Sequence, residues 1–94
     1  MNFKDYLLSC ISEESGEIVQ AVGKAHRFGL TDRKHSLDRT NFEHLRTEVH
    51  DLIAVYEMLC DTLHSDSVID RELIAAKKIK VADYMAYSRQ LGIL

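Results

Sequence analysis

The most informative segment of the chain reads Ser12-Glu13-Glu14-Ser15-Gly16-Glu17-Ile18-Val19-Gln20-Ala21-Val22. Around and within it, apolar residues recur at steps of three and four, which is the signature of a helix: Phe3, Leu7, Ile11, Ile18, Ala21, Val22 and Ala25. Glu14 falls between Ile11 and Ile18 in this series, so its side chain is expected to point at the core. Glu17 follows three residues later and shares that face, which Glu13 flanks. Because burying unpaired carboxylates is costly, a chain that does so usually supplies a cation.

A second segment repeats this arrangement, and its apolar series is Leu45, Val49, Leu52, Tyr56, Leu59 and Leu63. Glu48 lies three residues after Leu45 and four before Leu52, again on the core stripe, and Asp51 follows three residues later. If the two helices pack antiparallel, four or five carboxylates converge on one point. One such pair is common on solvated helix faces, whereas two pairs on apolar stripes indicate a site.

Bulk composition favours one helical domain over residues 1–94. The chain contains no proline and only four glycines, and 46% of its residues are hydrophobic. A net charge of −3 provides no basic field for nucleic acid. Cys10 and Cys60 have no metal-ligand spacing and are expected to be buried free thiols. The sequence has neither an apolar run long enough for a membrane span nor a signal peptide, so a cytoplasmic protein without a membrane partner is expected.

Three helices are predicted. The first covers residues 3–27, with Asn2 as a possible N-cap and Gly29 past its end. The second begins at the capping box Thr40-Asn41-Phe42-Glu43 and continues to residue 64. The third covers residues 68–90 and is expected to lie antiparallel beside the second, because the connection at residues 65–66 is short.

Three long helices make a thin bundle, and apolar residues remain unused near the C-terminus: Tyr84, Tyr87, Leu91, Ile93 and Leu94. The predicted fold class is therefore all-α, an antiparallel bundle of long helices completed by dimerisation and possibly a dimer of dimers. The alternative is that the C-terminal tail packs back on its own chain.

Between the first two helices lies a basic segment containing Arg27, Arg33, Lys34, His35 and Arg39. This segment can be a solvated loop, or a flap over an anionic ligand beside the acidic residues. Gly16 also allows two interpretations, since a glycine inside a helix either permits close packing or leaves room for a ligand.

Ligation by carboxylates alone favours Mg²⁺, with Mn²⁺ as a substitute, because hard cations prefer oxygen. Zinc would need a cluster of His or Cys. The Glu-x-x-His motif of di-iron bundles is absent, because Thr47 precedes His50 by three residues. His50 is expected to point away from the metal face. Magnesium in proteins is often shared with substrate phosphates, and Lys77, Lys78 and Lys80 could contact the same anion or simply be solvated.

Glu13-Glu14-Ser15-Gly16-Glu17 followed by Glu48-Val49-His50-Asp51 resembles the EExxE…ExxD signature of the MazG-like, all-alpha nucleoside triphosphate pyrophosphohydrolases. The segments at residues 24–30 and 51–59 look like a small single-domain branch found in phages and bacteria. The resemblance implies Mg²⁺-dependent cleavage of an NTP or dNTP between the α- and β-phosphates, giving the monophosphate and pyrophosphate. It also implies intertwined homodimers, sometimes paired into tetramers.

The resemblance implies a role for each matching residue. The implied metal ligands are Glu14, Glu17, Glu48 and Asp51. Glu13 matches the first acid of the signature and either binds a further metal or orients the attacking water. Lys78 would contact phosphate, with Lys24 and Arg27 as further candidates.

Two alternatives belong to other classes of protein. In the first, the chain is a helical interaction module in which Glu14 or Glu48 forms an ion pair across a dimer with a lysine of the third helix, and nothing is catalysed. In the second, the chain is a nucleotide-binding sensor that keeps the metal site but has no turnover.

Overall fold

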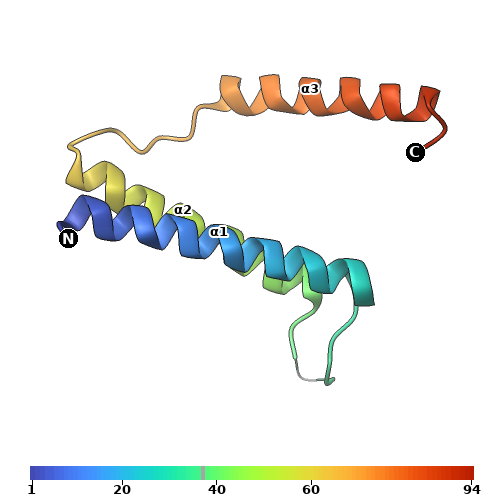
Figure 1. The fold of residues 1–94 in the computed structure, drawn as a ribbon, viewed down its shortest axis with the longest axis horizontal. Coiled ribbons are helices and arrows are strands. Elements are labelled where there is room, and N and C mark those ends of the chain that lie inside the picture. The colour runs from blue at the N-terminus through green and yellow to red at the C-terminus, as the bar shows by residue number, and fades with distance from the viewer. Residues whose placement is uncertain (37) are drawn as a thin grey trace.

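The computed structural model describes residues 1–36 and 38–94, and in this part of the chain the secondary structure is entirely helical (Figure 1). The helices are α1 (Phe3–Phe28), α2 (Asn41–Thr62) and α3 (Arg71–Gln90). The predicted all-α class is therefore confirmed.

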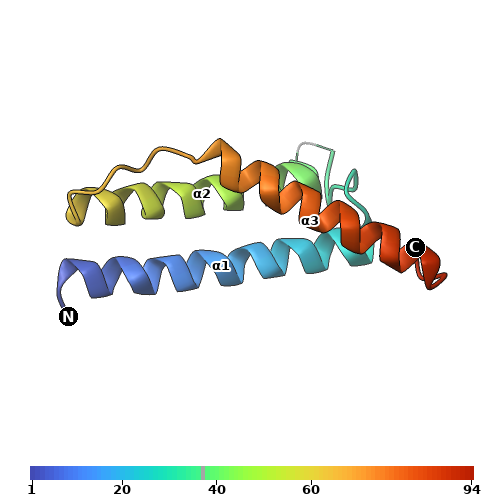
Figure 2. The same ribbon diagram turned by 90° about the horizontal axis from the view of Figure 1, so that it is seen from above.

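Helices α1 and α2 form an antiparallel pair, with the end of α2 lying beside the start of α1 (Figures 1 and 2). At the start of α1 the Asp5 amide donates to the Asn2 side chain at 2.9 Å, as the sequence predicts for an N-cap. At its end the Gly29 amide donates to the Ala25 carbonyl at 2.8 Å. Gly29 has φ 93°, a region that suits a residue without a Cβ, so the predicted stop is confirmed within one residue.

The start of α2 is fixed by the predicted capping box. The Glu43 amide donates to the Thr40 hydroxyl oxygen at 3.1 Å, and the Thr40 amide donates to the Glu43 carboxylate at 3.3 Å. These contacts satisfy two amides that a helix start otherwise leaves without partners. Helix α2 therefore begins where the sequence indicates, and it ends at Thr62 rather than at residue 64.

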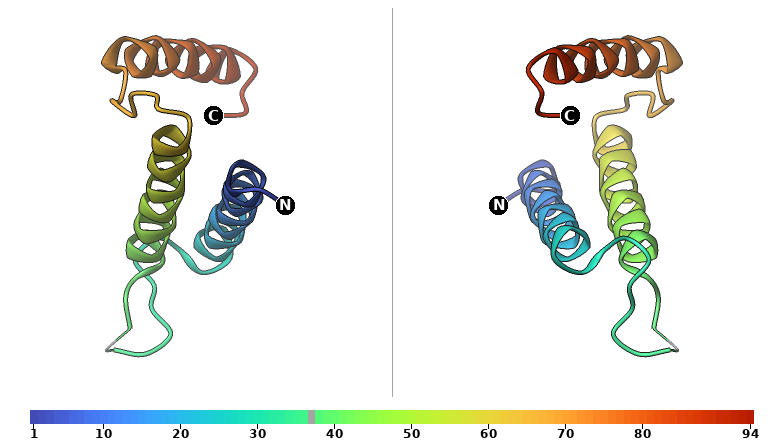
Figure 3. Two further views of the ribbon diagram at one scale, coloured as in Figure 1. Left: turned by 90° about the vertical axis from the view of Figure 1, so that its left-hand side faces the viewer. Right: turned by 90° about the vertical axis from the view of Figure 1, so that its right-hand side faces the viewer.

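Helix α3 differs from the expectation in both its start and its position. The Asp66 carboxylate accepts from the Val68 amide, and the Asp70 carboxylate accepts from the amides of Glu72 and Leu73, so Asp70 is the cap and the helix begins three residues later than predicted. The connection is correspondingly longer. Among the described residues α3 packs against neither α1 nor α2, and Figure 3 shows it standing clear of that pair. Within the described part of this chain, the packing of α3 beside α2 that the sequence predicts is therefore not seen.

The core lies between α1 and α2 and is small. Leu7, Ala21 and Cys60 are the buried apolar residues of the described chain, with Ala21 only 1% exposed. The expectation of buried free thiols is confirmed for Cys60, while Cys10 is half-buried. Most other large apolar side chains are exposed, including those along α3, because that helix has no packing partner in the described chain.

No described helix combines the length and the apolar composition that crossing a bilayer requires.

Candidate metal centre

Three of the predicted metal ligands converge between α1 and α2. One carboxylate oxygen each from Glu14, Glu48 and Asp51 lies within 4.8 Å of the other two. Glu14 comes from α1, and the other two come from α2, one turn apart. The antiparallel packing of the two helices thus joins residues that are far apart in the sequence.

Glu48 is the most enclosed of the three, at 8% exposed, whereas Glu14 is half-buried and Asp51 is exposed. The burial of Glu48 follows from its place on the apolar stripe that packs against α1. Glu48 Oε1 lies 3.0 Å from Nε2 of His44, one turn earlier on α2. This hydrogen bond holds the carboxylate in place, as partners of metal-binding carboxylates commonly do.

His44 was not among the residues predicted for the site. Its four-residue spacing from Glu48 is the signal that could have identified it, because residues at that spacing are neighbours on a helix surface. His50 behaves as expected, since it is exposed and its Nδ1 lies 2.7 Å from the Arg46 carbonyl oxygen of its own helix.

The remaining predicted carboxylates lie beside the group rather than in it. Glu17 is half-buried one turn further along α1, and its oxygens are outside the three-residue cluster. Glu13 is exposed, and its charge acts on Glu14. Within the single described chain, three of the four predicted metal ligands therefore lie together, and Glu17 does not join them.

Partial burial and the neighbouring carboxylates together raise the pKa of Glu14. The first cause is the partial loss of solvent around this carboxyl group. Repulsion by four neighbouring carboxylates adds to it, in the order Asp51, Glu48, Glu13 and Glu17. A protein without metal at this point therefore holds one carboxylate that resists ionisation, and a divalent cation would remove the repulsion.

A pH dependence of stability follows. A carboxyl group whose pKa is raised by folding binds more protons in the folded state, so the free energy of unfolding should decrease as pH rises from about 4.5 through the raised pKa. We expect Glu14→Gln to be more stable than the native chain at pH 7 in EDTA, with the difference shrinking toward pH 4.5.

Thermal unfolding of both proteins across this pH range measures the effect. Glu57→Gln, an exposed site on α2, is the control and should track the native chain. The comparison cancels the opposite contribution of Glu43, whose pKa is lowered by hydrogen bonds from Thr40. A Glu14→Gln protein that is less stable than the native chain at pH 7 would contradict the repulsion.

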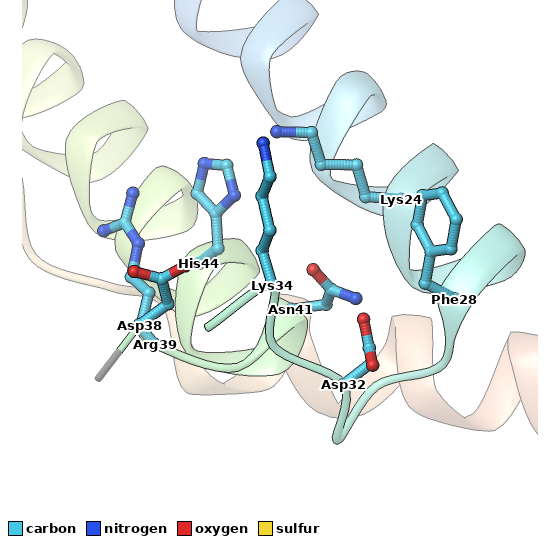
Figure 4. Close-up of a pocket in the computed structure, with 8 residues that line it drawn as sticks. All are labelled: Lys24, Phe28, Asp32, Lys34, Asp38, Arg39, Asn41 and His44. Carbon is cyan, nitrogen blue, oxygen red and sulfur yellow. The ribbon is translucent and has the colours of Figure 1, made fainter. Parts of the chain in front are cut away.

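A pocket of about 620 Å³ adjoins this cluster at the loop end of the helix pair (Figure 4). It is lined by Lys24 and Phe28 of α1, by Lys34 and Arg39 of the connecting segment, and by Asn41 and His44 of α2. Asp32 and Asp38 complete the lining. His44 therefore belongs both to this pocket and to the hydrogen bond with Glu48.

The three predicted phosphate-binding residues are placed differently. Lys24 lines the pocket. The Arg27 guanidinium lies 5.4 Å from the centre of the Phe28 ring, which is a cation–π contact. Arg27 itself does not line the pocket. Lys78 belongs to α3, which does not pack on the helices that carry the carboxylates in the described chain.

Gly16 is not required for close packing in this chain. A Cβ placed on Gly16 would meet no atom within 4 Å, and the same holds for Gly23. Both positions therefore face open space in the single chain. This agrees with the interpretation that Gly16 leaves room for a ligand.

The donor set fits a hard divalent cation. Carboxylate oxygens are the ligands that Mg²⁺ and Mn²⁺ prefer, and the exposed position of Asp51 leaves one side of the cluster open to water or to a phosphate. Comparison of the chain with protein-family models, with curated proteins and with solved structures finds no match.

Proposed function

We propose that this chain is a Mg²⁺-dependent nucleoside triphosphate pyrophosphohydrolase of the MazG-like type, converting an NTP or dNTP to the monophosphate and pyrophosphate. The observation that supports it is the convergence of Glu14, Glu48 and Asp51 from two helices, within 4.8 Å of one another. A basic pocket next to this cluster supplies the second element that a polyphosphate substrate needs.

In this proposal Glu14, Glu48 and Asp51 hold the metal, with Glu17 one turn away as a further ligand. Bound Mg²⁺ would neutralise phosphate oxygens and make a coordinated water more acidic. His44 keeps the Glu48 carboxylate oriented through the 3.0 Å contact. The chain thus contributes mainly positioning and charge, as in other phosphoryl-transfer sites.

We propose that Glu13, which is exposed beside the cluster, orients the attacking water and accepts its proton. A bond forms between the water oxygen and the α-phosphorus, and the bond from that phosphorus to the bridging oxygen breaks. The water proton passes to the Glu13 carboxylate and then to solvent. Pyrophosphate leaves with the electron pair of the broken bond.

Product analysis in ¹⁸O-labelled water tests this reaction. Incubation with Mg²⁺ and a dNTP should place the label in the nucleoside monophosphate and leave the pyrophosphate unlabelled. Label in pyrophosphate would mean attack at the β-phosphorus, and release of inorganic phosphate with a diphosphate would move the cut to the γ-position. Either result would overturn the proposed reaction.

The interaction-module alternative requires Glu14 or Glu48 to pair with a lysine of α3 across a dimer. Within the described chain the Glu48 carboxylate contacts His44 of its own helix at 3.0 Å. Removal of metal would leave the stability of such a module unchanged, which separates it from the proposed enzyme. The sensor alternative shares the metal site and is separated from the enzyme by the turnover measurement.

We further propose that two or four copies assemble in solution. The single chain buries very little apolar surface, and α3 carries large exposed side chains on one face, among them Leu73, Tyr84 and Tyr87. Folded domains rarely expose so much contiguous apolar surface without a partner. A second copy would cover this face of α3 and add to the small core.

Light scattering coupled to gel filtration checks this assembly. The native chain should have the mass of a dimer or tetramer, and Leu73→Glu should shift it toward the monomer, because Leu73 is 70% exposed on the apolar face. Ala75→Glu, which makes the same charge change on the opposite face of α3, should leave the mass unchanged. A native chain that is monomeric at tens of micromolar would refute the assembly.

A further inference from the structure

Two lysine side chains from different elements enter the pocket beside the carboxylate cluster. Lys24 comes from α1 and Lys34 from the segment between the helices, and Figure 4 shows their ammonium ends directed toward one another. In the described part of the chain neither ammonium has a carboxylate within 4 Å. In the same view Lys34 extends away from Asp32.

The lining also contains a third cationic side chain, Arg39, and the carboxylates of Asp32 and Asp38. The Asp38 carboxylate accepts from the His35 amide at 3.0 Å within the connecting segment. Two ammonium groups facing one cavity repel each other, and an anion placed between them removes that repulsion. The pocket therefore suits an anionic ligand with several oxygens.

The separation between the pocket and the carboxylate cluster can be followed along the two helices. Lys24 follows Glu14 by ten residues, or about 15 Å along α1 by the helical rise, and it follows Glu17, the proposed further ligand, by seven residues, or about 10 Å. On α2, His44 lines the pocket and contacts Glu48. A polyphosphate chain could thus extend from the carboxylate cluster to the two lysines.

We propose that Lys24 and Lys34 form the binding site for the pyrophosphate end of the substrate, the β- and γ-phosphates, and hold the leaving group. The identity of the anion rests on the proposed function, whereas the anion site itself rests on the pocket. The α-phosphate then lies at Glu14, Glu48 and Asp51, and the nucleoside lies beyond them, outside this pocket.

Calorimetric titration with sodium pyrophosphate, in EDTA and at low salt, tests the site without metal or turnover. We expect the native chain to bind pyrophosphate, and Lys24→Gln or Lys34→Gln to weaken binding at least about tenfold, as expected for loss of a charge-assisted contact. Lys34→Arg should retain most of the binding. Lys4→Gln, which removes an exposed lysine at the far end of α1, should bind as the native chain does.

Three results would overturn the inference. They are no pyrophosphate binding by the native chain, binding by both glutamine variants that is as tight as that of the native chain, and displacement of pyrophosphate by an unphosphorylated nucleoside. Helix content by circular dichroism confirms that each variant is folded. Failure of the proposed function gives a different pattern, because a protein with intact, lysine-dependent pyrophosphate binding and no turnover would refute only the enzyme. Turnover with lysine-independent binding would refute only this site.

Discussion

Replacement of Glu48 by Gln is expected to reduce nucleotide hydrolysis by at least about 100-fold, since loss of even an outer-shell partner costs 10- to 100-fold at metal sites. Glu48 is the most enclosed carboxylate of the cluster, so no water or neighbouring acid can readily replace it. Glutamine keeps the size of the side chain and can still contact His44, but it supplies no negative charge to a cation. The measurement is the rate of pyrophosphate release at saturating nucleotide and Mg²⁺.

Glu57→Gln provides the matched control, because it makes the same change on an exposed position of α2. Its rate should equal that of the native chain. Both variants should retain helical circular dichroism, which separates loss of a ligand from loss of the fold. A Glu48→Gln protein that turns over at the native rate would contradict the assignment of Glu48 to the metal.

Magnesium is expected to stabilise the folded protein substantially. A ligand that binds only the folded state adds about 2.7 kcal/mol at a concentration 100 times its Kd. For a chain of this size that corresponds to a rise in Tm of the order of 10 °C. The effect arises because the cation compensates the mutual repulsion of Glu14, Glu48 and Asp51. The pKa of Glu14 is raised first by partial burial and then by this repulsion.

Thermal unfolding with increasing Mg²⁺ measures this stabilisation. Asp51→Asn should lose most of it, while Asp61→Asn, an exposed acid near the end of α2, should keep it. Chelation by EDTA should return the native chain to its lower Tm. A Tm that does not respond to Mg²⁺, or that responds equally in Asp51→Asn, would argue against a metal at the cluster.

Local signals in the sequence were sufficient for the first two helices. Asn2, Gly29 and the Thr40–Glu43 capping box act through hydrogen bonds to their immediate neighbours, so their effect does not depend on the rest of the fold. The start of α3 was harder to predict, because it is fixed by the side-chain hydrogen bonds of Asp70, three residues after the start that the sequence indicates. Its position depends on contacts that are not local, which no cap or periodicity encodes.

Part of the candidate site could likewise be predicted from the sequence, and part depends on the fold. The placement of Glu14 and Glu48 on apolar stripes predicted that they face each other, and α1 and α2 bring them together with Asp51. Glu17 lies outside the cluster because α1 and α2 are antiparallel: a step of three residues forward along α1 moves Glu17 in the direction opposite to the step from Glu48 to Asp51 on α2. The Lys34 side of the pocket depends on the path of the connecting segment, so a basic composition could indicate an anion but not where it would bind.

The most direct test of the proposed function is pyrophosphate release from a panel of common NTPs and dNTPs, with and without Mg²⁺. We expect release of pyrophosphate and monophosphate in equal amounts from at least one nucleotide, dependent on Mg²⁺ and absent in EDTA. Equal turnover in EDTA, or no turnover on any nucleotide, would contradict it.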